Sequence, residues 1–405
     1  MSTNGGISFN KQNTLSDDND GEAKGVEARV NFAELSDHEG YIMGWWKDRD
    51  AGFSSAAPLD DGIETIDTGV EAQWQATERL DLTARATSLD KKTESEFSAI
   101  SIQGDYEVSD RFSVGLELRH ENEEDDILNT DGEATLAGAE IRYDLTEQTE
   151  VYTSGQFVID DNGDYESNAL ATIGVETQVS DRLALKTEVS SGDRGDAVVL
   201  GMEYDVTPNL NISLDAGFGS GATSQVGTNY TTANGLELYG SYATDPDRTD
   251  SGESMFTFGT RKRYGNGLSL YSESQFGEGE DEQSVARTYG LDFDLTEQWR
   301  LSASVQKNDI EDDLGDIDRR AATLGASYKG DDLKFGSVLE YREDDNNQTS
   351  EDATQWVTSN TVEWQQSESL RWLGKVELST THSDANKNDE AKYAELDLGF
   401  AYRPA

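Results

Sequence analysis

The feature that most constrains this chain is strict alternation of apolar and polar residues. It occurs in segments of about ten residues, the length of a membrane-crossing β-strand. Segment 112–120, Phe-Ser-Val-Gly-Leu-Glu-Leu-Arg-His, is an example: its apolar residues share one face, and Ser113, Glu117 and Arg119 share the other. This period of two is that of a β-strand, because successive side chains point to opposite sides of a sheet. The pattern predicts an all-β protein.

Short polar turns separate the alternating segments at one end. Their Asn-Gly, Asp and Ser residues are typical of hairpin turns. These turns lie at 36–38, 77–79, 109–111, 146–148, 180–182, 207–209, 234–235, 266–267, 296–298, 330–332 and 367–369. Longer acidic connections are predicted at 121–133, 160–167, 277–283, 308–318 and 343–352. Short turns at one end and long loops at the other are typical of a transmembrane antiparallel up-and-down β-barrel, with the short turns periplasmic and the loops extracellular.

The number of strands follows from their alternating up and down directions. Consistent up-and-down order requires a short strand at 224–232, paired with 236–243. The last strand, 393–402, then needs a partner near the N-terminus, and 6–11 supplies it. The chain, residues 1–405, is therefore expected to form a single barrel domain of about 24 strands, within a range of about 22–26 and even-numbered as in bacterial barrels.

The composition would by itself suggest disorder, since the formal charge is -50 and only 34% of residues are hydrophobic. Aromatic residues nevertheless make up 9% of the chain, and the apolar residues are patterned. A barrel wall needs an apolar side chain only at every second position, so the pattern favours a barrel over disorder. The sequence contains no apolar run long enough for a membrane helix. It also has no cysteine, and its acidic balance argues against nucleic acid as a partner.

Aromatic residues collect beside the short turns, all on the apolar face of their segments. Rings favour the boundary between hydrocarbon and water, so they predict a lipid-facing girdle rather than the core of a soluble sandwich. The girdle residues are Tyr106, Phe112, Tyr143, Tyr204, Phe293, Trp299, Tyr328, Phe335, Trp364, Trp372 and Tyr402.

The opposite face carries many ionised side chains, which a dry core could not hold. They are predicted to line a water-filled lumen. The predicted pore-lining residues are Glu71, Arg85, Asp105, Glu107, Glu117, Arg119, Glu140, Arg142, Asp144, Glu176, Lys186, Glu188, Glu203, Asp205, Asp292 and Asp294. About 24 strands give a diameter of about 50 Å. The sequence leaves three possibilities for the lumen: the loops fold into it, it is a wide pore, or a partner fills it.

Residues suited to catalysis are sparse. His38, His120 and His382 are the only histidines and are not expected to converge, and no nucleophile, zinc or phosphate-loop motif occurs. We therefore expect no enzyme. Oxygen-rich segments around Asp18, Asp20, Asp160 and Asp164 are candidate weak Ca²⁺ or Mg²⁺ ligands, although a solvated acidic rim explains them better. No other cofactor is predicted.

Several short segments resemble the C-terminal β-barrel region of large Gram-negative outer-membrane proteins. They are 396–404 (Leu-Asp-Leu-Gly-Phe-Ala-Tyr-Arg-Pro), the Tyr-Asp-Leu-Thr-Glu-Gln type of turn, 52–55 and 228–235. In that family the barrel is implied to be a membrane anchor or a pore for other domains. The chain ends at Arg403-Pro404-Ala405, where the family usually continues with another strand pair, so a trimmed or engineered barrel is expected.

We predict a monomeric barrel in the outer membrane of a Gram-negative bacterium, in contact with the lipid bilayer and lipopolysaccharide. Its function is predicted to be that of a wide, porin-like channel with weak cation preference, because the lumen face is mainly acidic. The alternative is a membrane anchor or export conduit for other domains, or for a lumen-filling or periplasmic partner.

Overall fold

The structure is a computed structural model that describes residues 3–13, 22–32, 39–51, 63–245, 253–279, 282–312, 315–347, 352–383 and 390–402. These residues form one 24-stranded antiparallel sheet. The strands are β1 (Thr3–Asn13), β2 (Glu22–Asn31), β3 (Gly40–Arg49), β4 (Thr65–Thr77), β5 (Leu80–Lys91), β6 (Ser95–Ser109), β7 (Phe112–Asp125), β8 (Thr130–Thr146), β9 (Thr149–Gly163), β10 (Leu170–Ser180), β11 (Leu183–Gly192), β12 (Gly195–Thr207), β13 (Leu210–Gly219), β14 (Ser224–Thr231), β15 (Leu236–Asp245), β16 (Glu253–Arg263), β17 (Leu268–Glu278), β18 (Glu282–Asp294), β19 (Trp299–Asp312), β20 (Gly315–Lys329), β21 (Leu333–Asn346), β22 (Ala353–Ser367), β23 (Leu370–Ser383) and β24 (Glu390–Tyr402).

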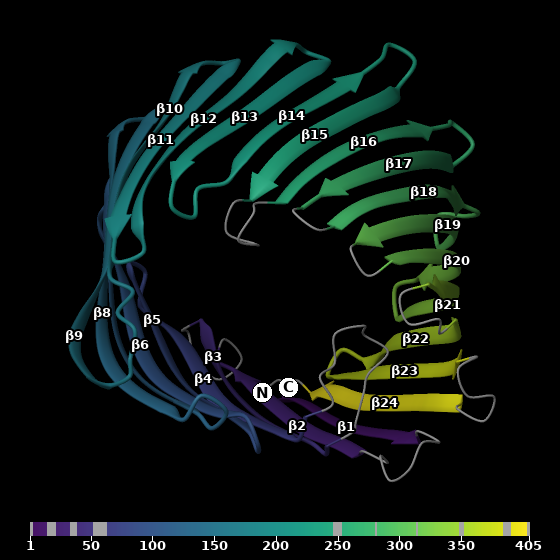
Figure 1. The fold of residues 1–405 in the computed structure, drawn as a ribbon, viewed down its shortest axis with the longest axis horizontal. Coiled ribbons are helices and arrows are strands. Elements are labelled where there is room, and N and C mark those ends of the chain that lie inside the picture. The colour runs from purple at the N-terminus through teal and green to yellow at the C-terminus, as the bar shows by residue number, and fades with distance from the viewer. Residues whose placement is uncertain are drawn as a thin grey trace.

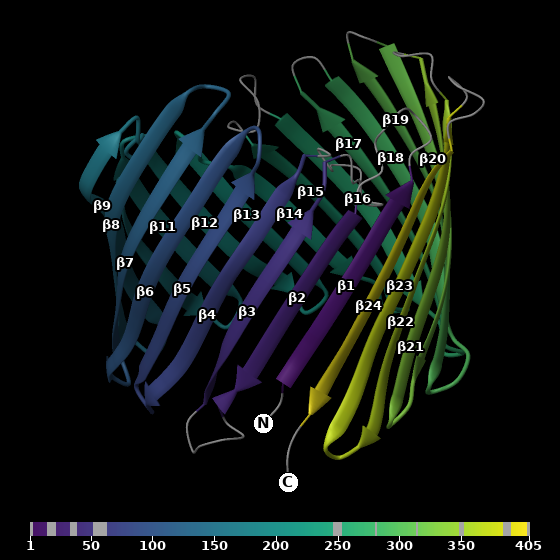
Figure 2. The same ribbon diagram turned by 90° about the horizontal axis from the view of Figure 1, so that it is seen from below.

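Each strand pairs with its neighbours in the sequence, and β1 also pairs with β24, from Gly5 opposite Phe400 to Asn13 opposite Lys392. Every strand therefore has two hydrogen-bonded neighbours. Figure 1 shows the strands arranged around a ring, and Figure 2 shows them tilted with respect to its axis. The strand number agrees with the count made from the turns, and β1 and β14 lie where strand direction required them. No helix among the described residues is long and apolar enough to cross a membrane.

The short turns share a local design. In the turn after β8, the Thr146 hydroxyl accepts a hydrogen bond from the backbone N–H of Gln148, at 3.1 Å. The same Ser/Thr bond recurs at Thr77, Ser109, Ser180, Thr207, Thr296 and Ser367. Such side-chain bonds stabilise a turn without a ladder partner. The Asn-Gly turns instead place Gly235 and Gly267 at positive φ, which glycine adopts without steric cost. The predicted turn 36–38 lies outside the described residues.

The prediction of long acidic loops is wrong for several connections. Strand β7 continues to Asp125 and β8 begins at Thr130, so 121–133 is mostly hydrogen-bonded ladder. Strands likewise extend into the predicted loops 160–167, 277–283, 308–318 and 343–352. The reason is that exposed carboxylates do not interrupt backbone pairing: residues 121–125 are all polar, yet each keeps a cross-strand partner on β8.

The sheet has two chemically different faces, and curvature identifies the inner one. Tyr152 on β9 hydrogen-bonds Glu188 on β11 past the intervening strand, and Tyr239 on β15 similarly reaches Glu273 on β17. Side chains reach across a strand most easily on a concave face, where they converge. The face that carries Tyr152 and Glu188 is therefore the inner face. The opposite face, which includes Leu116 with 61% of its surface exposed, is the outer face.

Candidate functional site

The polar residues that the sequence assigns to a lumen share the inner face. Cross-strand partners lie on the same side of a sheet, so the register links them. Glu71 is opposite Arg85, with 3.8 Å between the carboxylate and guanidinium atoms. Glu176 is opposite Lys186, and these ionised groups approach to 3.4 Å. The same register places on this face Asp105, Glu107, Glu117, Arg119, Glu140, Arg142, Asp144, Glu188, Glu203, Asp205, Asp292 and Asp294.

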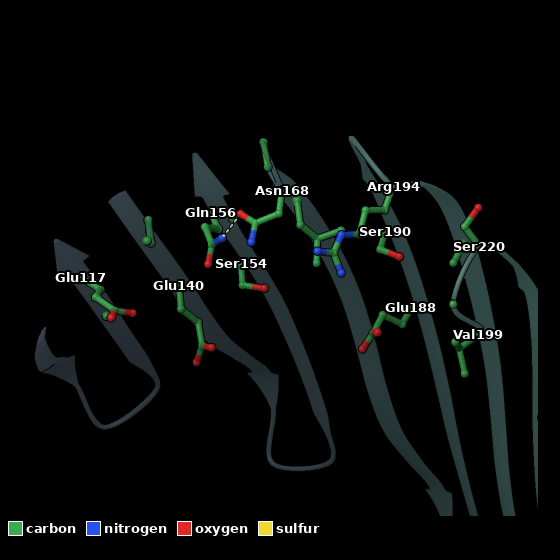
Figure 3. Close-up of a pocket in the computed structure, with 18 of the residues that line it drawn as sticks. Glu117, Glu140, Ser154, Gln156, Asn168, Glu188, Ser190, Arg194, Val199 and Ser220 are labelled. Atoms are coloured by element: carbon green, nitrogen blue, oxygen red, sulfur yellow. Dashed lines mark hydrogen bonds between the residues drawn. The ribbon is translucent and has the colours of Figure 1, made fainter. Parts of the chain in front are cut away.

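A hollow of about 720 Å³ lies on the inner face between β6 and β13. Figure 3 shows Glu117, Glu140 and Glu188 projecting into it from β7, β8 and β11, with Ser154 and Gln156 of β9 between Glu140 and Glu188. Glycines at 115 and 138 leave room there: a Cβ at Gly138 would lie 3.3 Å from the Glu117 side chain. The hollow is a polar recess in the wall, with more carboxylates than basic groups.

Three connections cover the rim of this hollow. Asn168, Arg194 and Ser220 line it from the connections after β9, β11 and β13. Asn168 accepts a hydrogen bond from Gln156 at 2.6 Å. The hydroxyl of Tyr165 donates to Glu121 at 3.0 Å, and burial together with this bond raises the pKa of Tyr165 to about 12. The connection 164–169 therefore folds against the inner face.

The connections after β9 and β11 are also joined to each other. The Asp193 carboxylate accepts hydrogen bonds from the Ser167 hydroxyl and from the backbone N–H of Ala169, the latter at 3.0 Å. These bonds hold the pKa of Asp193 below its ordinary value, because they stabilise the ionised carboxylate.

Two tyrosines of the inner face lie over a glycine of the next strand and bond a glutamate of the strand beyond. Each set forms one register row, which we call a Tyr-Gly-Glu clasp. The clasps are Tyr152, Gly174, Glu188 and Tyr239, Gly259, Glu273. A Cβ at Gly174 would lie 2.2 Å from Cζ of Tyr152, so only glycine admits the ring in this position. The tyrosine hydroxyls donate to the glutamates at 2.5 and 2.7 Å. Each clasp therefore ties three strands together on the inner face, a form of aromatic packing on sheet glycines.

The predicted aromatic girdle lies on the outer face, at the short-turn end. Its rings pack across strands: Phe112 and Tyr143 meet edge-on with centroids 6.2 Å apart, and those of Trp299 and Tyr328 are 5.1 Å apart. The other predicted girdle residues, Tyr106, Tyr204, Phe293, Phe335, Trp364, Trp372 and Tyr402, share this face by register.

A second aromatic belt, which the sequence reasoning missed, lies on the outer face farther from the short turns. It includes Trp46, Phe157, Phe218, Tyr242, Phe256, Phe276, Tyr289, Tyr341 and Trp356. Trp364 and Trp356 belong to different belts of the same strand, and their eight-residue separation corresponds to about 20 Å along the membrane normal at ordinary strand rise and tilt. The signal in the sequence was an aromatic residue seven to eleven positions from the short turn, about the height of a hydrocarbon layer.

The histidines and candidate metal ligands do not form a site in the described part of the chain. His120 lies on the outer face, 3.1 Å from the Thr135 hydroxyl, and His382 is near the far end of β23. No group of three or more metal-ligating side chains occurs among the described residues. Asp160 is opposite Thr135 of β8, and Asp164 lies in the connection after β9. Asp18, Asp20 and His38 fall outside the described residues.

Comparison with solved structures finds similar folds at very low identity. The siderophore receptor PiuA from Acinetobacter baumannii is 11% identical with a TM-score of 0.51, and the match covers 98% of this chain and 82% of the receptor. The copper transporter OprC gives 11% identity and a TM-score of 0.53, over 98% of this chain and 80% of the transporter. The siderophore receptor PirA from Pseudomonas aeruginosa is 12% identical with a TM-score of 0.53, and the match covers 98% of this chain and 80% of the receptor.

These similar structures are Gram-negative outer-membrane β-barrels, so the chain has the all-β antiparallel fold of that class. The predicted location in the outer membrane agrees with theirs. No protein-family model matches the sequence, and no curated protein is similar to it.

Proposed function

We propose that the chain is a closed transmembrane barrel of the outer membrane and forms a wide, water-filled pore with a weak preference for cations. The observation that carries this proposal is the separation of the two faces. Apolar residues and two aromatic belts occupy the outer face, and ionised residues occupy the inner face. A spanning sheet must satisfy all its backbone groups, which the pairing of β1 with β24 allows.

In this proposal the short turns face the periplasm and the acidic ends of the strands face outward, toward lipopolysaccharide. The belts fit an apolar band about 25 Å tall. Cation preference follows from the acidic excess on the inner face, exemplified by Asp105, Glu117 and Glu140, whose negative potential attracts cations. The preference is weak because a pore about 50 Å wide greatly exceeds the Debye length of about 8 Å at physiological salt.

The test is single-channel recording from the purified chain in planar bilayers. We expect a large, stable conductance and a reversal potential that shows cation preference in dilute KCl but little preference at 1 M. Anion preference in dilute KCl would contradict the proposed selectivity. The absence of any stable conductance would contradict the pore and favour an anchor, or a conduit filled by another domain.

A further inference from the structure

A group of basic residues gathers at one side of the inner face, close to the short turns. We call it the basic arc. It comprises Arg261, Arg263, Arg300, Lys329, Lys334 and Arg371, from strands β16, β19, β20, β21 and β23. Register places them on the inner face: Arg263 is opposite Ser269, Arg300 is opposite Asp294, and Lys334 is opposite Glu363. All lie within three residues of a strand end at a short turn.

The other side of the inner face at this height is mainly acidic, with Lys186 on β11 as a basic exception. On β5, β6, β8 and β12 the corresponding inward residues are Asp81, Asp105, Glu107, Asp144, Glu203 and Asp205. The two sides are separated by tens of ångströms in a ring of about 24 strands, several times the Debye length of about 8 Å. The acidic side therefore does not cancel the local potential of the basic arc.

Two cations of the arc, Lys329 and Arg261, make no ion pair with the described residues. Lys329 and Lys334 are directly opposite each other, an arrangement that repulsion disfavours in a sheet. Lys334 pairs with Glu363 at 3.0 Å, whereas the described residues give Lys329 no ion-pair partner. Arg261 is opposite Glu237 in the register, but its guanidinium lies over the Tyr271 ring at 5.8 Å and makes no ion pair with a described carboxylate. These positions carry positive charge that a bound anion would balance.

The remaining charges hold the arc in place. Asp294 sits between Arg263 at 2.9 Å and Arg300 at 2.8 Å. One carboxylate cannot use all the donors of two guanidinium groups, so N–H groups of both stay available. A hollow of about 1020 Å³ lies beside Arg263, Arg300 and Lys329. A second hollow, of about 860 Å³, lies beside Lys329 and Lys334. Asp292 and Glu237 line a smaller neighbouring hollow with Arg261.

We propose that the basic arc binds small solutes that carry phosphate groups. Guanidinium forks match phosphate oxygens in pairs, and ammonium groups bind them as point charges. The inference rests on the proposed water-filled pore, because the solute must reach the inner face. It adds to that proposal an anion site within a pore whose overall preference is for cations.

The test is titration of the full chain, folded in detergent or nanodiscs at low ionic strength, with inorganic pyrophosphate. Calorimetry and ³¹P line broadening would report binding. The variant combines Arg300→Gln, Lys329→Gln and Lys334→Gln, and we expect its affinity to fall at least tenfold. The matched control combines R79Q, R111Q and R182Q, which removes three basic residues from short turns on the acidic side. This control should bind pyrophosphate as tightly as the unmodified chain does.

A charge-preserving variant, K329R with K334R, should retain binding and shows whether a loss comes from charge or from misfolding. No binding by the unmodified chain, or equal loss in the variant and the control, would overturn the proposed site. Conductance is recorded on the same samples. Conduction without pyrophosphate binding refutes the site alone, whereas binding without conduction refutes free passage through the pore but shows that solute reaches the inner face.

Discussion

The Tyr-Gly-Glu clasp at Tyr152 gives a sharp prediction for Gly174→Ala. The new Cβ would lie 2.2 Å from the tyrosine ring, so the ring, which is 8% exposed, must leave its place. Exposing about half of a ring that buries about 200 Å² costs about 2.5 kcal/mol at about 25 cal/mol per Å². The lost hydrogen bond to Glu188 adds about 1 kcal/mol, and alanine recovers about 0.5 kcal/mol of backbone entropy. We expect unfolding free energy to fall by about 3 kcal/mol.

Equilibrium unfolding in denaturant, with the barrel in lipid vesicles, measures this loss. Tyr152→Phe keeps the ring over glycine and removes only the hydrogen bond, so it should cost about 1 kcal/mol. In a Tyr152→Ala background, Gly174→Ala should cost almost nothing, since no ring remains to be displaced. Gly44→Ala is the control, because its nearest neighbour would be a backbone oxygen at 3.6 Å. The clasp would be refuted if Gly174→Ala left stability unchanged. It would also be refuted if Gly174→Ala cost as much in the Tyr152→Ala background as in the unmodified chain.

Three further predictions concern the two faces and one rim connection. Replacing Glu117 and Glu140 with glutamine should lower the potassium-to-chloride permeability ratio in dilute salt, measured from reversal potentials. An unchanged ratio would show that these carboxylates do not contribute to ion selectivity. Leu116→Arg, on the outer face, should lower the unfolding free energy by about 2–4 kcal/mol, whereas Glu117→Arg on the inner face should cost much less, and equal costs would contradict the assignment of faces. The pKa of Asp193 is below its ordinary value, so its bonds stabilise the rim above the ordinary pKa of 3.8 and are lost as pH falls through the lowered pKa. Amide exchange at 167–169 should therefore be slow from neutral pH to about pH 4 in the unmodified chain and fast in Asp193→Asn. Equal exchange rates in the two proteins would show that Asp193 does not stabilise this connection.

The strands and turns could be predicted from the sequence because their causes are local. Alternation within 112–120 is enough to assign a strand and its two faces. Thr146 and Gln148 make the turn bond within three residues, so the motif can be read directly. The strand number followed from direction alone, since each turn or loop reverses the chain.

Strand ends and the inner-face contacts could not be predicted, because they depend on register. The acidic residues of 121–125 have the composition of a loop, but they pair along β8. Gly174 lies opposite both Tyr152 and Glu188 only when three strands are aligned, and nothing in the local sequence marks it. The basic arc likewise collects residues from five strands, so its members look isolated along the chain.

The central claim is that alternate residues of each strand face water in a lumen and lipid outside. The chain has no cysteine, so single cysteines can be placed at each position of 113–119 in β7. A charged, membrane-impermeant thiol reagent applied to the barrel in lipid vesicles measures which positions are wet. We predict reaction at 113, 115, 117 and 119 and protection at 114, 116 and 118. Uniform reactivity across the segment, or the opposite alternation, would contradict a transmembrane barrel with a polar interior.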